Sequence, residues 1–230
     1  MVRFIGVLLI GLLTACGNIV VSETEEKAAQ SVLEFYGGTC QQSKGVTSTD
    51  GVTNTYFELE MSNSALLDSY ASMLEMPASN IAFLFFSNLK DDRTKYTQIK
   101  VKINLTTGES YENTYSTKDL VEVESLIPIL AEVSDKIKAH DYEGFRALFV
   151  QEEETNVSAE QLQSHCAPLD SAYGNIDQTQ FQGYAFFESE QDERALVHLA
   201  GIQIREKENT PISLYIDRKS KGITTFKNKF

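Results

Sequence analysis

Two kinds of hydrophobic repeat alternate along this chain of 230 residues and restrict the folds open to it. Residues 28–36 and 126–137 carry apolar side chains three or four positions apart, which is the period of an amphipathic helix. Residues 56–61 and 99–105 instead alternate apolar and polar side chains, which is typical of a strand with one buried face. The predicted fold class is therefore α+β, with helices packed on antiparallel, curved sheets.

The first half of the chain is predicted to run helix, two strands, two helices, two strands. Ser22 and the acids that follow predict a helix start near residue 23, and Gly37 predicts its end. A second helix is capped by Ser64 and ends or bends at Pro77. A third, buried helix is expected at residues 78–89, because this apolar run is longer than most strands. The expected strands are residues 40–47, 52–61, 96–105 and 110–116, with Asp50-Gly51 as a strong turn signal.

The second half is predicted to contain three helices followed by four strands. Ser125 is expected to cap the first helix, with Pro128 in its first turn. The second helix begins at His140-Asp141, and the third runs from a cap at Ser158 to Gly174. The expected strands are residues 179–188, 194–206, 212–217 and 223–226, with a bulge at Gly201, and the acidic run 152–154 is expected in a solvated loop. The two halves form domains 24–118 and 119–230, or else one continuous α+β unit.

The first sixteen residues have the layout of a secretory signal peptide. Arg3 supplies the positive start, residues 4–13 are apolar or glycine, and small residues precede Cys16. This apolar run is too short to span a bilayer as a permanent helix. Residues 17–23 then form a short tether, so the folded chain is expected to lie close to the membrane.

The sequence Leu13-Thr14-Ala15-Cys16 resembles the lipobox of bacterial lipoproteins. The resemblance implies cleavage before Cys16 and lipidation of its thiol, and several acyl chains would hold the protein on a membrane essentially permanently. It therefore predicts a lipid-anchored protein of the bacterial cell envelope. Gly17 follows the cysteine, at the position where an Asp would favour retention in the inner membrane. The absence of Asp there favours the outer membrane and leaves the inner one open. The alternatives are an ordinary signal peptide with a chance cysteine, or a short buried N-terminal strand.

The chain is acidic, with 20 Lys and Arg against 33 Asp and Glu, and its formal net charge is −13. This excess disfavours nucleic acid and anionic lipid surfaces as partners.

The chain has two cysteines in addition to Cys16. Cys40 and Cys166 either pair in a disulfide or stay as separate buried thiols. His165 adjoins Cys166, but neighbours on a helix point about 100° apart, which is poor geometry for a catalytic pair.

Residues 135–149, DKIKAHDYEGFRALF, resemble the helical opening of NTF2-like cone domains, in which an Asp-Tyr or Asp-Phe turn joins two helices. The segment 158–162 and Gly174 correspond to the third helix and its end, so the resemblance covers residues 119–230. It rests on a pattern and not on a fixed motif. It implies a curved sheet with a concave, ligand-binding face, around which we expect Tyr184, Phe186, His198 and Tyr215. The Asp-His pair of the family's enzymes cannot be carried over to this chain.

No catalytic or metal-binding motif stands out in the sequence. The three histidines His140, His165 and His198 lack the spacing of a zinc site, and there is no phosphate loop, nucleophile elbow or dinucleotide glycine run. No metal or cofactor is predicted.

Three hypotheses remain. The favoured one is a non-catalytic envelope lipoprotein that binds another protein or assists an envelope complex. A small-ligand-binding cone module is the second. The third is a hydrolase, which a buried acid paired with His198 would favour.

Overall fold

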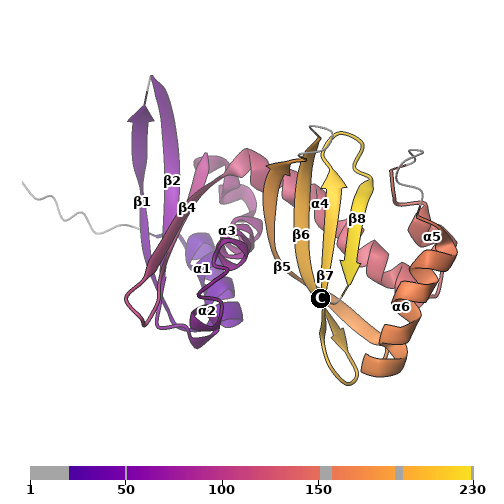
Figure 1. The fold of residues 1–230 in the computed structure, drawn as a ribbon. Helices are drawn as coiled ribbons and strands as arrows, with labels where there is room; N and C mark the ends of the chain where they lie inside the picture. Colours follow the sequence, from indigo (N-terminus) through magenta and orange to yellow (C-terminus); the bar gives the residue numbers. More distant parts are fainter. Residues whose placement is uncertain (1–20, 50, 151–156, 190–193, 229–230) are drawn as a thin grey trace, which may run out of the picture.

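The computed structural model describes residues 21–49, 51–150, 157–189 and 194–228. Cys16 and the acidic run 152–154 lie outside these ranges. The chain forms two four-stranded sheets with helices packed against them, which confirms the α+β class (Figure 1). None of the helices in the described ranges has both the length and the apolar character needed to cross a bilayer.

The N-terminal half contains the sheet β1-β2-β3-β4. Its β2 and β3 are parallel, a pairing that the predicted antiparallel sheets did not include, because two helices cross over between these strands. Side chains of one face, among them Phe57, Leu59 and Ile99, are fully buried beneath the helices. The elements are α1 (Glu23–Tyr36), β1 (Thr39–Thr49), β2 (Val52–Ser62), α2 (Ala65–Ser69), α3 (Glu75–Asn88), the 3-10 helix η1 (Lys90–Lys95), β3 (Gln98–Asn104) and β4 (Ser110–Ser116).

The C-terminal half contains the antiparallel meander β5-β6-β7-β8. Val197, Leu199 and Leu214 lie in its core and are fully buried, and the long helix α4 passes behind the sheet (Figure 1). The elements are α4 (Thr117–Lys138), α5 (Tyr142–Arg146), α6 (Ala159–Tyr173), β5 (Ile176–Glu188), β6 (Ala195–Arg205), β7 (Thr210–Asp217) and β8 (Ile223–Asn228).

Capping residues set several helix ends where the sequence predicts them. Ser22 and Ser158 both form capping boxes, at the starts of α1 and α6. Gly37 and Gly174 end these helices with positive φ angles of 66° and 81°. The start of α1 at Glu23, with Ser22 as its cap, is as predicted, and residues 17–20 of the predicted tether lie outside the described residues.

The two helices whose limits were predicted from a proline differ from those limits. α4 is capped by Ser116 and not by Ser125, so Pro128 lies inside the helix and not in its first turn. The apolar stripe of α4 already begins at Leu120, which packs fully buried in the core. The helix after Ser64 is also shorter than predicted: α2 ends at Ser69, and Pro77 lies in the first turn of α3, where its missing N–H costs least.

The two halves meet where α3 packs against β5. Gly183 sits at this contact with a φ of 147°, and a Cβ atom there would lie 2.2 Å from the carbonyl oxygen of Met76. The backbone N–H of Tyr184 donates a hydrogen bond of 2.8 Å to Ser79 Oγ on α3. α3 also packs against β3 of the other sheet, so one helix serves both halves. The domain boundary near residue 118 stays a prediction.

The bulge predicted at Gly201 lies instead on the neighbouring strand. The register of β5 and β6 shifts between Phe181 and Gly183, so that Gln182 has no partner on β6. Gly201 has a packing role, because a Cβ atom there would approach Leu130 Cδ2 of α4 to 3.0 Å.

Candidate partner-binding groove

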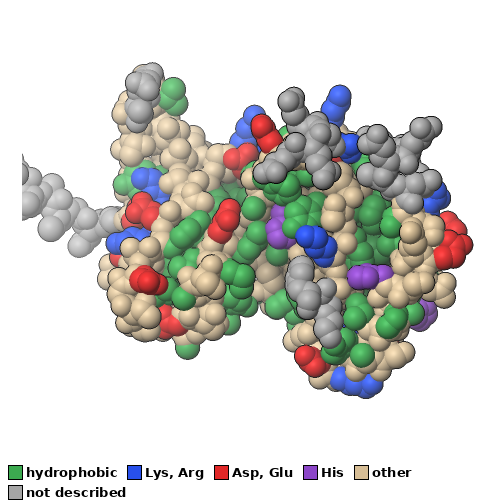
Figure 2. Space-filling view, viewed as in Figure 1, with side chains coloured by type: hydrophobic (Ala, Val, Ile, Leu, Met, Phe, Trp, Pro, Cys, Tyr) green, Lys and Arg blue, Asp and Glu red, His purple; other side chains and the backbone are tan. Residues whose placement is uncertain are grey.

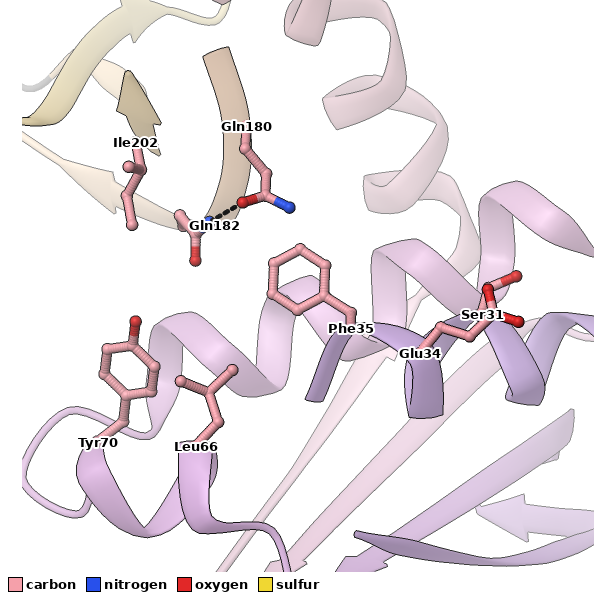
Figure 3. Close-up of a pocket in the computed structure, with 8 residues that line it drawn as sticks. All are labelled: Ser31, Glu34, Phe35, Leu66, Tyr70, Gln180, Gln182 and Ile202. Atoms are coloured by element: carbon pink, nitrogen blue, oxygen red, sulfur yellow. Dashed lines mark hydrogen bonds between the residues drawn. The ribbon is translucent and has the colours of Figure 1, made fainter. Parts of the chain in front are cut away.

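A cavity of about 510 Å³ lies between the first two helices and the outer face of the C-terminal sheet (Figure 3). Helices α1 and α2 supply one wall, and β5 and β6 supply the other. Figure 3 shows Phe35, Leu66 and Tyr70 on the helical side, across from Gln182 and Ile202. The lining residues are Ser31, Glu34, Phe35, Leu66, Tyr70, Gln180, Gln182 and Ile202.

A second cavity of about 210 Å³ continues the first along the sheet. The two share Tyr70, Gln182 and Ile202, so we treat them as one junction groove. The further residues of the groove are Met73, Met76, Pro77, Ala200, Gly201, Pro211, Ile212 and Ser213, which are almost all apolar. Glu34 is the only charged side chain among the residues that line the two cavities.

Large apolar side chains are exposed in this groove because helix α2 and the connection to α3 are too short to bury them. α2 has only five residues, and it buries Leu67 while leaving Leu66 37% exposed. Met73, in the connection to α3, is 61% exposed. Figure 2 shows hydrophobic side chains reaching the surface where the two halves meet. Neighbouring exposed apolar side chains at a concave surface are typical of an interaction site.

The β5 bulge supplies the polar part of the groove. Gln182, the residue without a partner on β6, donates a hydrogen bond of 3.3 Å from its amide nitrogen to Gln180 Oε1. Amide side chains offer both donors and acceptors, so they can pair with a polypeptide backbone. The groove therefore combines an apolar wall with neutral hydrogen-bonding groups.

The four residues expected around a ligand cavity lie on two different faces of the C-terminal sheet. Tyr184 is paired with Leu199, and both are buried on the helix-covered face. Phe186 shares that face, with Arg218 stacked over its ring at 4.3 Å. His198 pairs with Tyr215 on the opposite face. The four side chains therefore do not line one cavity.

His198 stacks on Tyr215 with a ring-centroid distance of 4.6 Å. Its Nε2 atom is buried and has no hydrogen-bond partner. Burial, together with the nearby charge of Lys227, lowers the pKa of His198, which favours the neutral imidazole. Among the residues that the structure describes, no carboxylate forms a hydrogen bond with His198 Nε2, as an acid–base pair would require.

The other histidines sit beside aromatic rings. His140 Nδ1 lies 3.3 Å from the Tyr142 hydroxyl, and the His165 ring meets the edge of Phe226. Within the described ranges, no three His, Cys, Asp or Glu side chains gather in a way that would hold a metal ion.

Cys40 and Cys166 are both free thiols, which corrects the disulfide alternative. Cys40 lies on β1 of the first sheet, whereas Cys166 is fully buried on α6 of the other half. Burial, with a smaller effect of Asp170, raises the pKa of Cys166 to about 12. Its neighbour His165 is exposed, so the two do not form a nucleophile pair.

A buried arginine is the main polar feature that sequence reasoning missed. The Arg205 guanidinium is fully buried and donates to Asp170 Oδ1 at 2.6 Å and to Gln203 Oε1 at 2.9 Å. It also bonds the carbonyl of Gly174 and the hydroxyl of Thr210. With its hydrogen bonds satisfied, this group holds the end of α6 against the sheet.

No family model, no curated protein and no solved structure matches the chain. The lipobox and NTF2-like resemblances stay predictions from the sequence.

Proposed function

We propose that this protein is a lipid-anchored envelope lipoprotein that binds another envelope protein through the junction groove, without catalysing a reaction. The observation that carries the proposal is the exposure of Leu66 and Met73 beside a concave, largely apolar surface. Fully burying one such side chain contributes roughly 1.5–3 kcal/mol. Covering the exposed parts of Leu66 and Met73 would supply part of the binding free energy, and contacts along the rest of the groove would have to supply the remainder.

The chemistry of the groove indicates the kind of partner segment that it accepts. The apolar wall fits a segment with two or more large apolar side chains, and the Gln180 and Gln182 amides can pair with its backbone. The charge of Glu34 and the net charge of −13 favour a segment with basic residues at its ends. The proposed occupant is therefore an apolar polypeptide segment with flanking Lys or Arg.

The alternatives have less support from the geometry. On the helix-covered face of the C-terminal sheet, Tyr184, Leu199 and Leu214 are buried in packed contacts, so this face is filled by protein side chains. A hydrolase would need an acid paired with His198, and its ring stacks on Tyr215 instead. We therefore favour protein binding over small-ligand binding or hydrolysis.

The proposal is tested by crosslinking in living cells followed by pull-down of the tagged protein. We compare the natural chain with a Leu66→Asp, Met73→Asp double variant, in which two charges replace the exposed apolar wall. The natural chain should recover one stoichiometric envelope protein. The amount of partner recovered with the double variant should fall about tenfold or more, because each 1.4 kcal/mol of lost binding free energy is a factor of ten in affinity.

A Val121→Asp variant is the matched control. Val121 is also apolar and 53% exposed, but it lies on α4 outside both cavities. Its partner recovery should equal that of the natural chain. Equal recovery by the groove variant and the natural chain would contradict the proposal, and so would recovery of the protein alone.

A further inference from the structure

Three of the four outer sheet edges are guarded. β5 carries two register shifts, and α3 covers part of it, where Ser79 Oγ accepts from the Tyr184 N–H. β8 has six residues, and Ile223 exchanges backbone hydrogen bonds with Leu148 and Val150. β4 has seven residues and is contacted by α3 and α4. Such devices prevent an edge from pairing with another chain.

The fourth edge, β1, is contacted on one face by α1, but it is longer than β4 and β8 and, unlike β5, it carries no register shift. It has eleven residues and pairs with β2 in an unbroken register, without proline or bulge. Its one charged side chain is Lys44, whose ammonium binds Glu25 Oε2 of α1 at 2.8 Å and so points to the helix-covered face. Apart from β2, no described segment of the chain makes a backbone hydrogen bond to β1. Figure 1 shows β1 as the outermost strand of its sheet.

We propose that β1 is the contact between two copies of this chain, which pair antiparallel along their β1 edges and join two four-stranded sheets into one. The pairing is isologous, because the same strand serves both copies about a two-fold axis. It satisfies the outward N–H and C=O groups of β1. This surface is separate from the junction groove.

The charge pattern of β1 suits a second copy as the occupant. A net charge of −13 makes two copies repel each other in general. The row of β1 side chains that faces away from the helices is neutral, so no like charges meet at the seam. These residues are Thr39, Gln41, Ser43, Gly45 and Thr47.

The first residues that the structure describes lie beside the middle of β1. Glu25 Oε2 accepts from the backbone N–H of Ser22 at 2.7 Å and from Lys44 Nζ at 2.8 Å. A two-fold axis perpendicular to the joined sheet keeps both α1 helices on the same side, near the seam. Both tethers then lead to one membrane, where anchoring raises the effective concentration of the copies. The raised effective concentration rests on the proposed lipid anchor, whereas the pairing of β1 does not.

The test is cysteine crosslinking of the full-length protein in its native membranes. In a Cys40→Ser background, we introduce Ser43→Cys near the centre of β1 and treat the membranes with a short bismaleimide. Cys166 can stay, because it is fully buried. The Ser43→Cys protein should migrate as a covalent dimer in a denaturing gel, and adding Gln41→Lys with Thr47→Lys should abolish that dimer through charge repulsion at the seam.

Thr114→Cys in the same background is the matched control, because Thr114 is exposed on the same face of the sheet but on the guarded edge β4. It should give no dimer, and neither should the background without an added cysteine. A monomeric Ser43→Cys protein would overturn the proposal. It would also fail if Ser43→Cys crosslinked only to a different protein, if Thr114→Cys formed dimers equally, or if the two lysines left the dimer intact.

Discussion

Glu25 shows how one buried side chain fixes the start of α1. It is 1% exposed and accepts hydrogen bonds from Ser22, from Lys44 and from the Tyr96 hydroxyl. Burial alone would raise the pKa of this carboxyl. The hydrogen bonds from Lys44 and Tyr96 lower it by more than burial raises it, so the pKa lies below the ordinary value. The carboxylate is therefore the favoured form in the folded protein.

Replacing Glu25 by Gln should destabilise the protein by about 2–3 kcal/mol at neutral pH, because the buried end of the ion pair with Lys44 is lost. A depressed pKa contributes stability above the unfolded value near 4.5 and loses it as the pH falls through the folded value. Urea unfolding at several pH values should therefore show the two proteins converging in acid. Glu23→Gln, which removes a largely exposed pair with Lys27, is the control and should change little. A constant difference between Glu25→Gln and the natural chain at every pH would contradict this account.

Cys16 is the residue on which the proposed anchor depends. A Cys16→Ser variant should lose incorporation of labelled fatty acid, because the acyl chains need a thiol at this position. Cys40→Ser and Cys166→Ser should keep full labelling, since neither cysteine follows a lipobox-like sequence. Fatty-acid labelling that persisted in Cys16→Ser would show that the lipobox interpretation is wrong.

Single residues also show where sequence reasoning stopped short. The alternation that places Val197 and Leu199 on the inner face continues to Gln203 and Arg205, so the sequence held a signal for these inward polar groups that the sequence-based predictions did not use. It did not indicate their partner Asp170, which comes from a helix distant in the chain. Long-range pairing of this kind depends on tertiary packing and not on local pattern.

Among the secondary-structure elements, those with caps and turn signals were predictable, and those with internal proline were not. Capping boxes at Ser22 and Ser158 gave the correct starts of α1 and α6. Pro128 misled the prediction of α4, because proline usually marks a first turn and here lies exposed inside a long helix held by its buried stripe. Tertiary packing overrides the local preference in that helix.

The contact between α3 and β5 depends on one glycine, which gives a test at this scale. Gly183→Ala should cost about 3 kcal/mol or more, because the added Cβ would meet the Met76 carbonyl and the backbone has a φ of 147°. Gly108→Ala is the matched control, with a φ of 91° but open space around it, and it should cost about 1 kcal/mol. Denaturant midpoints would measure both. Equal losses would show that α3 does not press on β5 as described.

At the scale of the whole molecule, two helix-backed sheets share one helix, and the groove arises where they meet. The sequence predicted the helices and the strands of both halves, because each type of element has its own hydrophobic period. It could not predict the groove, because its walls come from α1 and α2 on one side and from β5 and β6 on the other. The prediction of a cavity around His198 was wrong for a related reason. The face on which a side chain lies depends on strand register, and the register is fixed by the neighbouring strands.

The most direct test of the central claim is site-specific photocrosslinking in living cells, with a photoreactive amino acid at Met73 in the groove and, in a parallel strain, at Val121 on α4. Both positions are exposed, so differences in accessibility do not decide the result. The account predicts one discrete adduct with an envelope protein from position 73, absent from position 121 and reduced by Leu66→Asp. The same adduct from both positions, or none from position 73, would contradict the claim that this groove is where the protein binds its partner.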